Sequence, residues 1–127
     1  MSRWGMLKMF ILRMYEDANG NSPVAEYLAK VNAKARISKD GRIRAGKIAE
    51  YFNYLRTYGT RLGLPAMRHI EDGIWELRPT NDRFFFAYWK GDTFIILHHH
   101  VKKVQKAPRR EIDRAKRNLE DFLKRGI

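Results

Sequence analysis

The sequence predicts an α+β fold, in which an antiparallel sheet of four or five strands follows a helical hairpin and precedes a C-terminal helix. Three observations support this fold class. Short apolar runs separated by turn residues follow residue 73, two stripes with helical spacing precede them, and a third such stripe follows Pro108. The 127 residues contain no internal repeat and no low-complexity tract, which favours a single domain over residues 1–127.

Two helices are expected ahead of the main strands. The first begins with Ser22 as its N-cap and Pro23 in its first turn, and it ends near residues 31–33. The second helix is predicted over Ser38–Thr57, where apolar residues follow a 3.6-residue period. A short polar link makes the pair a hairpin that can pack across one face of the sheet. Before it, Leu7–Tyr15 predicts a further strand.

Three apolar runs after residue 73 predict consecutive antiparallel strands. They are Ile74–Leu77, Phe84–Trp89 and Thr93–Val101, and Pro, Gly, Asn and Asp residues divide them. Residues 66–71 predict a short strand ahead of these three. The stripe after Pro108 predicts the terminal helix.

Alternation along these strands predicts two chemically different faces of the sheet. The mainly apolar set, which we expect to face the core, is Trp75, Leu77, Phe84, Phe86, Ile95, Leu97 and His99. The opposite face, on which Phe94 and Ile96 also fall, gathers the cationic or titratable residues Arg78, Arg83, His98, His100 and Lys102. Because His99 points away from its neighbours, the three adjacent histidines do not predict a zinc site. No metal or other cofactor is expected.

The charge is strongly basic. Twenty-six Lys and Arg residues against 14 Asp and Glu residues give a net charge of +12, and ten of the basic residues lie between Lys102 and Arg125. Such an excess predicts a polyanionic partner, which is nucleic acid, an acidic protein or a membrane surface. Nucleic acid binding is favoured over the alternative of a merely soluble basic protein.

Cysteine usage and hydropathy suggest a compartment. The sequence has no cysteine, which excludes disulfides and favours the reducing cytoplasm. No apolar run reaches the length of about 20 residues that a membrane-spanning helix needs. We therefore expect a cytoplasmic protein without a membrane partner.

Several short motifs, taken in order, resemble the RelE/ParE toxin superfamily, and most closely its phage-derived, HigB-like branch. They are Ser22-Pro23-Val24 with Glu26-Tyr27-Leu28, the stretch Gly73–Arg78, Arg83 at the head of an aromatic strand, and the stretch Leu97–Pro108. The resemblance extends from about Met6 to Arg125. It implies a RelE-like fold and the toxin of a type II toxin–antitoxin pair. It also implies a metal-independent endoribonuclease that cuts messenger RNA on the ribosome, with an antitoxin, often a helix-turn-helix protein, as partner.

The resemblance also suggests roles for individual residues. Arg83 and Lys103 match positions at which RelE-like toxins place phosphate-binding cations, and Arg78 matches the arginine of the preceding strand. Glu76 stands where RelE has a lysine, and a C-terminal tyrosine of some members has no counterpart, so the resemblance assigns no base or acid. The residue types that can fill these roles here are found at His98, His100 and Glu76.

Further basic residues are expected to anchor RNA through its phosphates. These are Lys102, Lys106, Arg109 and Arg110. Two other functions fit the same composition: a ParE-like inhibitor of DNA gyrase, and a basic nucleic-acid-binding module without catalytic activity. Acidic segments are expected in the antitoxin, because it would have to cover a cationic surface.

Overall fold

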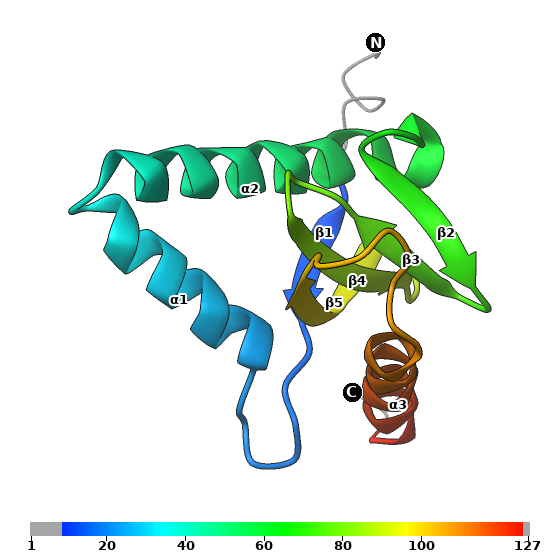
Figure 1. The fold of residues 1–127 in the computed structure, drawn as a ribbon. Coiled ribbons are helices and arrows are strands. Elements are labelled where there is room, and N and C mark those ends of the chain that lie inside the picture. Colours follow the sequence, from blue (N-terminus) through cyan, green and yellow to red (C-terminus); the bar gives the residue numbers. More distant parts are fainter. Residues whose placement is uncertain (1–8, 126–127) are drawn as a thin grey trace, which may run out of the picture.

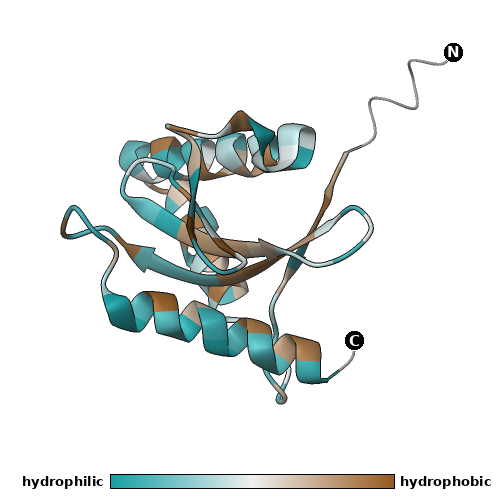
Figure 2. Ribbon diagram, turned by 90° about the vertical axis from the view of Figure 1, so that its right-hand side faces the viewer, coloured by the Kyte–Doolittle hydropathy of each residue, from teal (hydrophilic) through white to brown (hydrophobic). Residues whose placement is uncertain are grey.

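The computed structural model describes residues 9–125 and has three layers (Figures 1 and 2). The helices α1 and α2 cover one face of a five-stranded sheet, and α3 covers part of the other. The predicted α+β class is therefore confirmed. In chain order the elements are β1 (Ile11–Met14), α1 (Pro23–Ala35), α2 (Lys39–Tyr58), the 3-10 helix η2 (Gly59–Leu62), β2 (Met67–Glu71), β3 (Ile74–Leu77), β4 (Asp82–Tyr88), β5 (Thr93–Val101) and α3 (Arg109–Lys124).

The helical hairpin forms where its capping residues predict it. The Ser22 hydroxyl accepts a hydrogen bond from the N–H of residue 25, and the Ser38 hydroxyl accepts one from Gly41. Helix α1 continues two residues past the predicted end, to Ala35. Gly41 belongs at the junction because a Cβ atom there would lie only 2.6 Å from the carbonyl oxygen of Lys34. The caps and this close approach fix the turn between the helices.

The sheet has the strand order β1-β5-β4-β3-β2, and it is mixed rather than wholly antiparallel. Strands β2 to β5 form the predicted antiparallel meander, whereas β1 lies parallel to β5, with Ile11 opposite Thr93. Residue alternation carries no information on strand direction, so the predicted antiparallel pairing of this strand is wrong. The predicted strand Leu7–Tyr15 is shorter here, and its residues 7 and 8 lie outside the described residues.

Both faces of the sheet carry apolar residues, which differs from the prediction of one apolar and one cationic face. Phe84, Phe86 and Ile96 pack beneath α1 and α2. Phe85, Leu97 and other residues of the opposite face pack against α3. The cationic side chains therefore occupy only the part of that face which α3 leaves uncovered. None of the helices within residues 9–125 is long and apolar enough to cross a membrane.

A bulge in β5 explains a second difference. Phe86 pairs with Ile96 while Phe85 pairs with His98, so Leu97 is an extra residue in β5. Ile95 and Leu97 consequently share a face with His98 and not, as predicted, with His99. Phe94 and Ile96 lie on the hairpin side instead.

Candidate active site

Three neighbouring strands bring the predicted site residues to the face that α3 partly covers. In the register of the sheet, Arg83 of β4 lies opposite His100 of β5, and Glu76 of β3 lies opposite Phe85. The Phe85 ring stacks on His100, with ring centroids 5.3 Å apart, and on His98 at 6.3 Å. Arg83, His98 and His100, which the alternation predicted to gather, therefore do share one face.

Glu76 is the only carboxylate shared by two arginines at this end of the described sheet. Its side chain is 2% exposed, and its Oε1 lies 3.1 Å from Nε of Arg68 and 3.5 Å from Nε of Arg78. The Nε of Arg78 is buried and has no hydrogen bond among the described residues. This carboxylate is engaged in ion pairs, which favours a role in holding the two guanidinium groups over the role of a general base.

Arg83 adds a third guanidinium group to the same cluster. Its side chain is buried, and Nη1 donates hydrogen bonds to the carbonyl oxygens of Thr80, at 2.6 Å, and Asp82, at 3.0 Å. Burial, together with Arg78 and Arg68, lowers the pKa of Arg83, and Glu76 partly opposes this. Within residues 9–125 Arg83 forms no ion pair. We call Arg68, Arg78, Arg83 and Glu76 the arginine cluster. Its three positive charges face one negative charge, so an anion would be stabilised beside it.

His98 and His100 are placed differently beside this cluster. Nε2 of His98 lies 2.7 Å from Oε1 of Glu111, in the first turn of α3. Nε2 of His100 is buried and has no hydrogen-bond partner among the described residues. Burial lowers the pKa of both histidines, although Glu111 partly opposes it. Both imidazoles are therefore neutral near pH 7 and able to accept a proton.

The Glu111 carboxylate is ionised in this arrangement. Burial raises its pKa, but the hydrogen bond from His98 and the nearby His100 outweigh that effect, so the net shift is downward. An ionised Glu111 accepts a hydrogen bond from Nε2–H of His98 and thereby fixes the orientation of that ring. Glu111 was not among the residues predicted from the sequence.

A cavity of about 590 Å³ opens beside His100. Lys103 and Arg110 line it together with Glu111, and the side chain of Arg110 is 85% exposed. Lys102 does not line this cavity. Its backbone N–H donates to the carbonyl oxygen of Asn81, which ties the segment after β5 to the turn before β4. The cavity therefore joins the partly buried His100 to the exposed cations of Lys103 and Arg110.

Lys106 and Arg109 lie on the other side of the segment that links β5 to α3. They line a second cavity, of about 580 Å³, with Arg68. Arg109 forms a two-pronged ion pair with Glu71, with N–O distances of 2.6 and 2.7 Å, and also contacts Asp113. These hydrogen bonds raise the pKa of Arg109 and lower that of Glu71 to about 2. Arg109 is thus already paired, which weakens the expectation that it binds RNA.

A buried network on the hairpin side holds the strand that carries Arg83. Asp82 accepts hydrogen bonds from Tyr27 at 2.6 Å, from two nitrogens of Arg44 at 2.9 Å, and from His99 at 2.8 Å. The His99 ring also stacks on Tyr27. The prediction that His99 points away from its neighbours is confirmed.

Sequence reasoning missed both Arg68 and Glu111. Arg68 pairs directly with Glu76 across the β2–β3 hairpin, so the Asp72-Gly73 turn signal could have placed it there. Glu111 could have been flagged as the acidic residue in the first turn after Pro108. Among residues 9–125, no group of three His, Asp or Glu side chains could hold a metal ion.

The fold and the site together define a class. A helical hairpin and a single helix on opposite faces of a five-stranded sheet, with an arginine cluster beside two histidines, describe a RelE-like α+β protein. The chain belongs to the family described as Phage derived protein Gp49-like (DUF891), whose family model matches residues 28–120. That family is part of the RelE/ParE-like superfamily of toxin–antitoxin toxins, so an antitoxin partner is implied. No curated protein matches the chain.

Proposed function

We propose that this protein is a toxin that cleaves messenger RNA on the ribosome, as a metal-independent endoribonuclease. One observation carries the proposal. The guanidinium groups of Arg68 and Arg78 share the Glu76 carboxylate, and Arg83 lies opposite His100, whose buried Nε2 has no partner among the described residues. A cluster with excess positive charge fits a phosphodiester, and an unpaired neutral imidazole fits a general base.

Cleavage of RNA through its own 2′-hydroxyl needs few groups. A base must take the hydroxyl proton, cations must stabilise the charge that develops on the phosphorane, and an acid must protonate the leaving oxygen. Residues directly opposite on antiparallel strands have Cβ atoms about 4.5–5.5 Å apart. Arg83 and His100 are such a pair. A phosphate held by Arg83 would therefore lie within reach of the imidazole.

The proposed reaction has one bond formed and one broken. Nε2 of His100 removes the proton from the 2′-hydroxyl, and the 2′-oxygen bonds to phosphorus as the bond to the 5′-oxygen breaks. The Lys103 ammonium, which lines the same cavity, protonates the leaving 5′-oxygen. The products are a 2′,3′-cyclic phosphate and a 5′-hydroxyl. Glu76 and Glu111 act in this scheme by holding Arg68, Arg78 and His98 in place.

The ribosome would supply what the small site lacks, namely an ordered messenger strand. A net charge of +12 favours association with an RNA-rich particle. The superfamily membership supports the same assignment. The HigB-like branch and the cytoplasmic location remain predictions.

A reconstituted translation reaction tests the proposal. The purified protein is added to messenger RNA with and without ribosomes, and new 5′ ends are mapped and tested for a 5′-hydroxyl. We expect cleavage only with ribosomes, its loss in His100→Gln, and full activity in His69→Gln. His69 is a matched control because it is exposed, its Nε2 contacts the carbonyl oxygen of Asp72, and its ring packs on Trp75.

Two outcomes would replace the proposal. Intact messenger RNA together with inhibited supercoiling by DNA gyrase would indicate a ParE-like inhibitor. Intact messenger RNA with RNA binding that survives replacement of Arg78, Arg83 and Lys103 by Ala would indicate a non-catalytic module.

The antitoxin is proposed to be a helix-turn-helix protein with acidic segments that cover the arginine cluster. The charge of the toxin makes such a contact sensitive to salt. We expect the affinity of the co-expressed antitoxin to fall as salt rises from 0.05 to 0.5 M, a range chosen around the physiological value of about 0.15 M. An affinity independent of salt would contradict an acidic contact surface.

A further inference from the structure

The outer side of α3 carries four basic residues, of which only Arg110 also lines the cavity beside His100. At 3.6 residues per turn, Arg110, Arg114, Arg117 and Lys124 fall within an arc of about 80° around the helix axis. All four are exposed. The buried residues Ile112, Ala115 and Phe122 lie on the opposite side of the helix. We call these four basic residues the α3 ridge.

The ridge differs from the other basic residues of α3 in its ion pairs. Arg109 and Lys116 are bound to Glu71 of β2, and Lys116 also contacts Asp72. Within residues 9–125, Arg114, Arg117 and Lys124 form no ion pair, and Arg110 has only a loose contact of 3.6 Å to Glu111. The ridge is thus a row of uncompensated cations.

One acidic residue lies inside this arc and is paired, while Asp113 and the exposed Glu120 lie just outside it. Asp121 falls within the same arc, but it accepts a hydrogen bond from Tyr15 and pairs with Arg125 at 3.1 Å. Those hydrogen bonds, that of Tyr15 foremost, lower its pKa. The negative charge is therefore shared with Arg125 and does not cancel the row.

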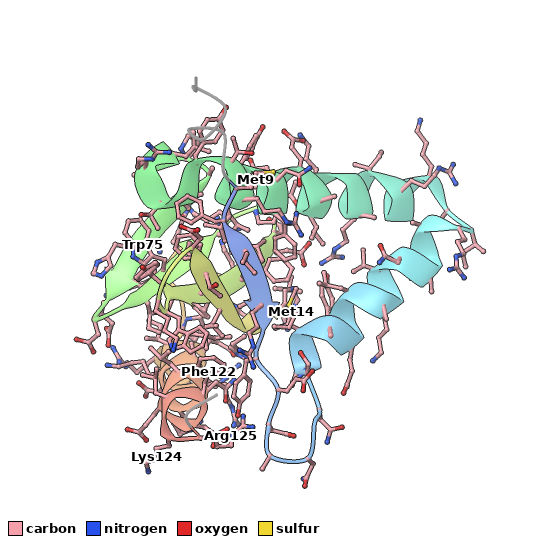
Figure 3. The ribbon with its side chains drawn as sticks, turned by 180° about the vertical axis from the view of Figure 1, so that it is seen from behind. Met9, Met14, Trp75, Phe122, Lys124 and Arg125 are labelled. Carbon is pink, nitrogen blue, oxygen red and sulfur yellow. The ribbon has the colours of Figure 1, made fainter. Side chains whose placement is uncertain are left out.

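The length and shape of the α3 ridge are suited to binding a rigid polyanion. From Arg110 to Lys124 the ridge extends about 21 Å, at a rise of 1.5 Å per residue. Figure 2 shows α3 as a layer of its own beside the sheet, with hydrophilic residues along its length. In Figure 3, Lys124 points away from the sheet at the end of the helix, whereas Phe122 lies between helix and sheet.

We propose that the α3 ridge is a docking surface for the phosphate backbone of double-helical RNA. The ridge itself has no aromatic residue, and the one aromatic residue of α3, Phe122, is buried. Single-stranded binders stack bases on exposed aromatic rings, so a row of cations alone fits backbone contacts better. A docking surface for an acidic protein would need an apolar centre, which the four basic residues do not supply.

The choice of RNA over DNA rests on the proposed function, but the ridge does not. Its charge and exposure are independent of whether His100 and the arginine cluster cut RNA. Structured ribosomal RNA is the chemistry that would meet such a surface if the protein works on ribosomes. Binding assays with purified duplexes separate the two proposals, because they require no cleavage.

The test compares two triple variants with the same change of charge. One removes ridge cations (Arg114→Gln, Arg117→Gln, Lys124→Gln), and the control removes exposed cations of the helical hairpin (Lys30→Gln, Lys34→Gln, Lys39→Gln). The probe is a fluorescent 20-base-pair RNA duplex, titrated between 0.05 and 0.3 M salt. All six positions are exposed, so both variants should keep the wild-type circular dichroism spectrum.

Each lost phosphate contact reduces the magnitude of the negative slope of log K against log salt by about 1. We expect the ridge variant to lose about 3 in slope and at least about tenfold in affinity at 0.1 M salt. The control should lose less than about 1 in slope. Equal losses in the two variants would show that only total charge matters and would overturn the proposal.

Two competing ligands complete the test. If the ridge variant loses binding to poly-glutamate but keeps binding to duplex RNA, the ridge serves an acidic protein and the proposal is wrong. A DNA duplex of the same sequence that binds more tightly than the RNA duplex at equal salt would also overturn it.

Discussion

The buried network around Asp82 gives the strongest stability prediction. In Asp82→Asn the amide keeps one oxygen that can accept, but its NH₂ group must face a donor of Tyr27, Arg44 or His99. Breaking a buried, hydrogen-bonded charge pair costs about 3–5 kcal/mol. The lower end applies here because the side chain of Arg44 is 43% exposed and water can replace part of what it loses. We expect a loss of about 3 kcal/mol in the free energy of unfolding.

Urea unfolding, followed by tryptophan fluorescence and circular dichroism, measures this loss. The matched control is Asp40→Asn, an exposed residue in the first turn of α2, where a negative charge contributes about 0.3–1 kcal/mol through the helix dipole. If Asp82→Asn costs no more than Asp40→Asn, the network does not join the hairpin to β4. The reasoning about how Arg83 is held would then fail as well, because Arg83 donates to the carbonyl oxygen of Asp82.

Four further results are expected. Replacing His100 by Gln should lower the cleavage rate by about 10²–10⁴ with little change in the Kd for a non-cleavable RNA, as measured by single-turnover assays. On the acid side, the wild-type rate should begin to fall below pH 6.5, because burial lowers the pKa of His100 from that value and protonation removes the base. Replacing Arg68 by Gln should raise KM more than it lowers kcat, at a cost of about 1 kcal/mol in stability, since Arg78 still pairs with Glu76. Acid should remove the stability that Asp82 contributes. Burial raises the pKa of Asp82, but its hydrogen bonds outweigh this effect and hold the pKa below the ordinary 3.8. The stabilisation is therefore complete above pH 3.8 and is lost as the pH falls further, which unfolding measured at pH 2–5 would show.

The parts of the fold that depend on short-range chemistry could be predicted. The caps at Ser22 and Ser38 act on residues three positions away, and the strand runs are bounded by their own turn residues. The Asp82 network could not be predicted, because its partners Tyr27, Arg44 and His99 are 55, 38 and 17 residues away. No local pattern contains such contacts.

The candidate site could be predicted only in part, because some of its contacts also join residues that are far apart in the sequence. Alternation alone grouped Arg83 with His100. The pairing of Arg109 with Glu71, 38 residues away, depends on how α3 docks beside β2, which the sequence does not show. The arginine cluster likewise needed the pairing of Arg68 with Glu76 across a hairpin.

The bulge at Leu97 links the fold to the proposed chemistry. If the same sequence alternated strictly, with no bulge at Leu97, His98 and His100 would turn toward the helical hairpin and His99 toward α3. Instead His99 reaches Asp82 on the hairpin side, and both other imidazoles join the face of Arg83. The bulged conformation thus supplies one histidine to the network that anchors β4 and two to the face beside the arginine cluster. Deleting Leu97 would place His98 directly after Ile96 in regular alternation, so all three histidines should keep their faces. The stability that Asp82 provides and any activity that depends on His100 should therefore survive this deletion, and the loss of both would contradict the assigned bulge.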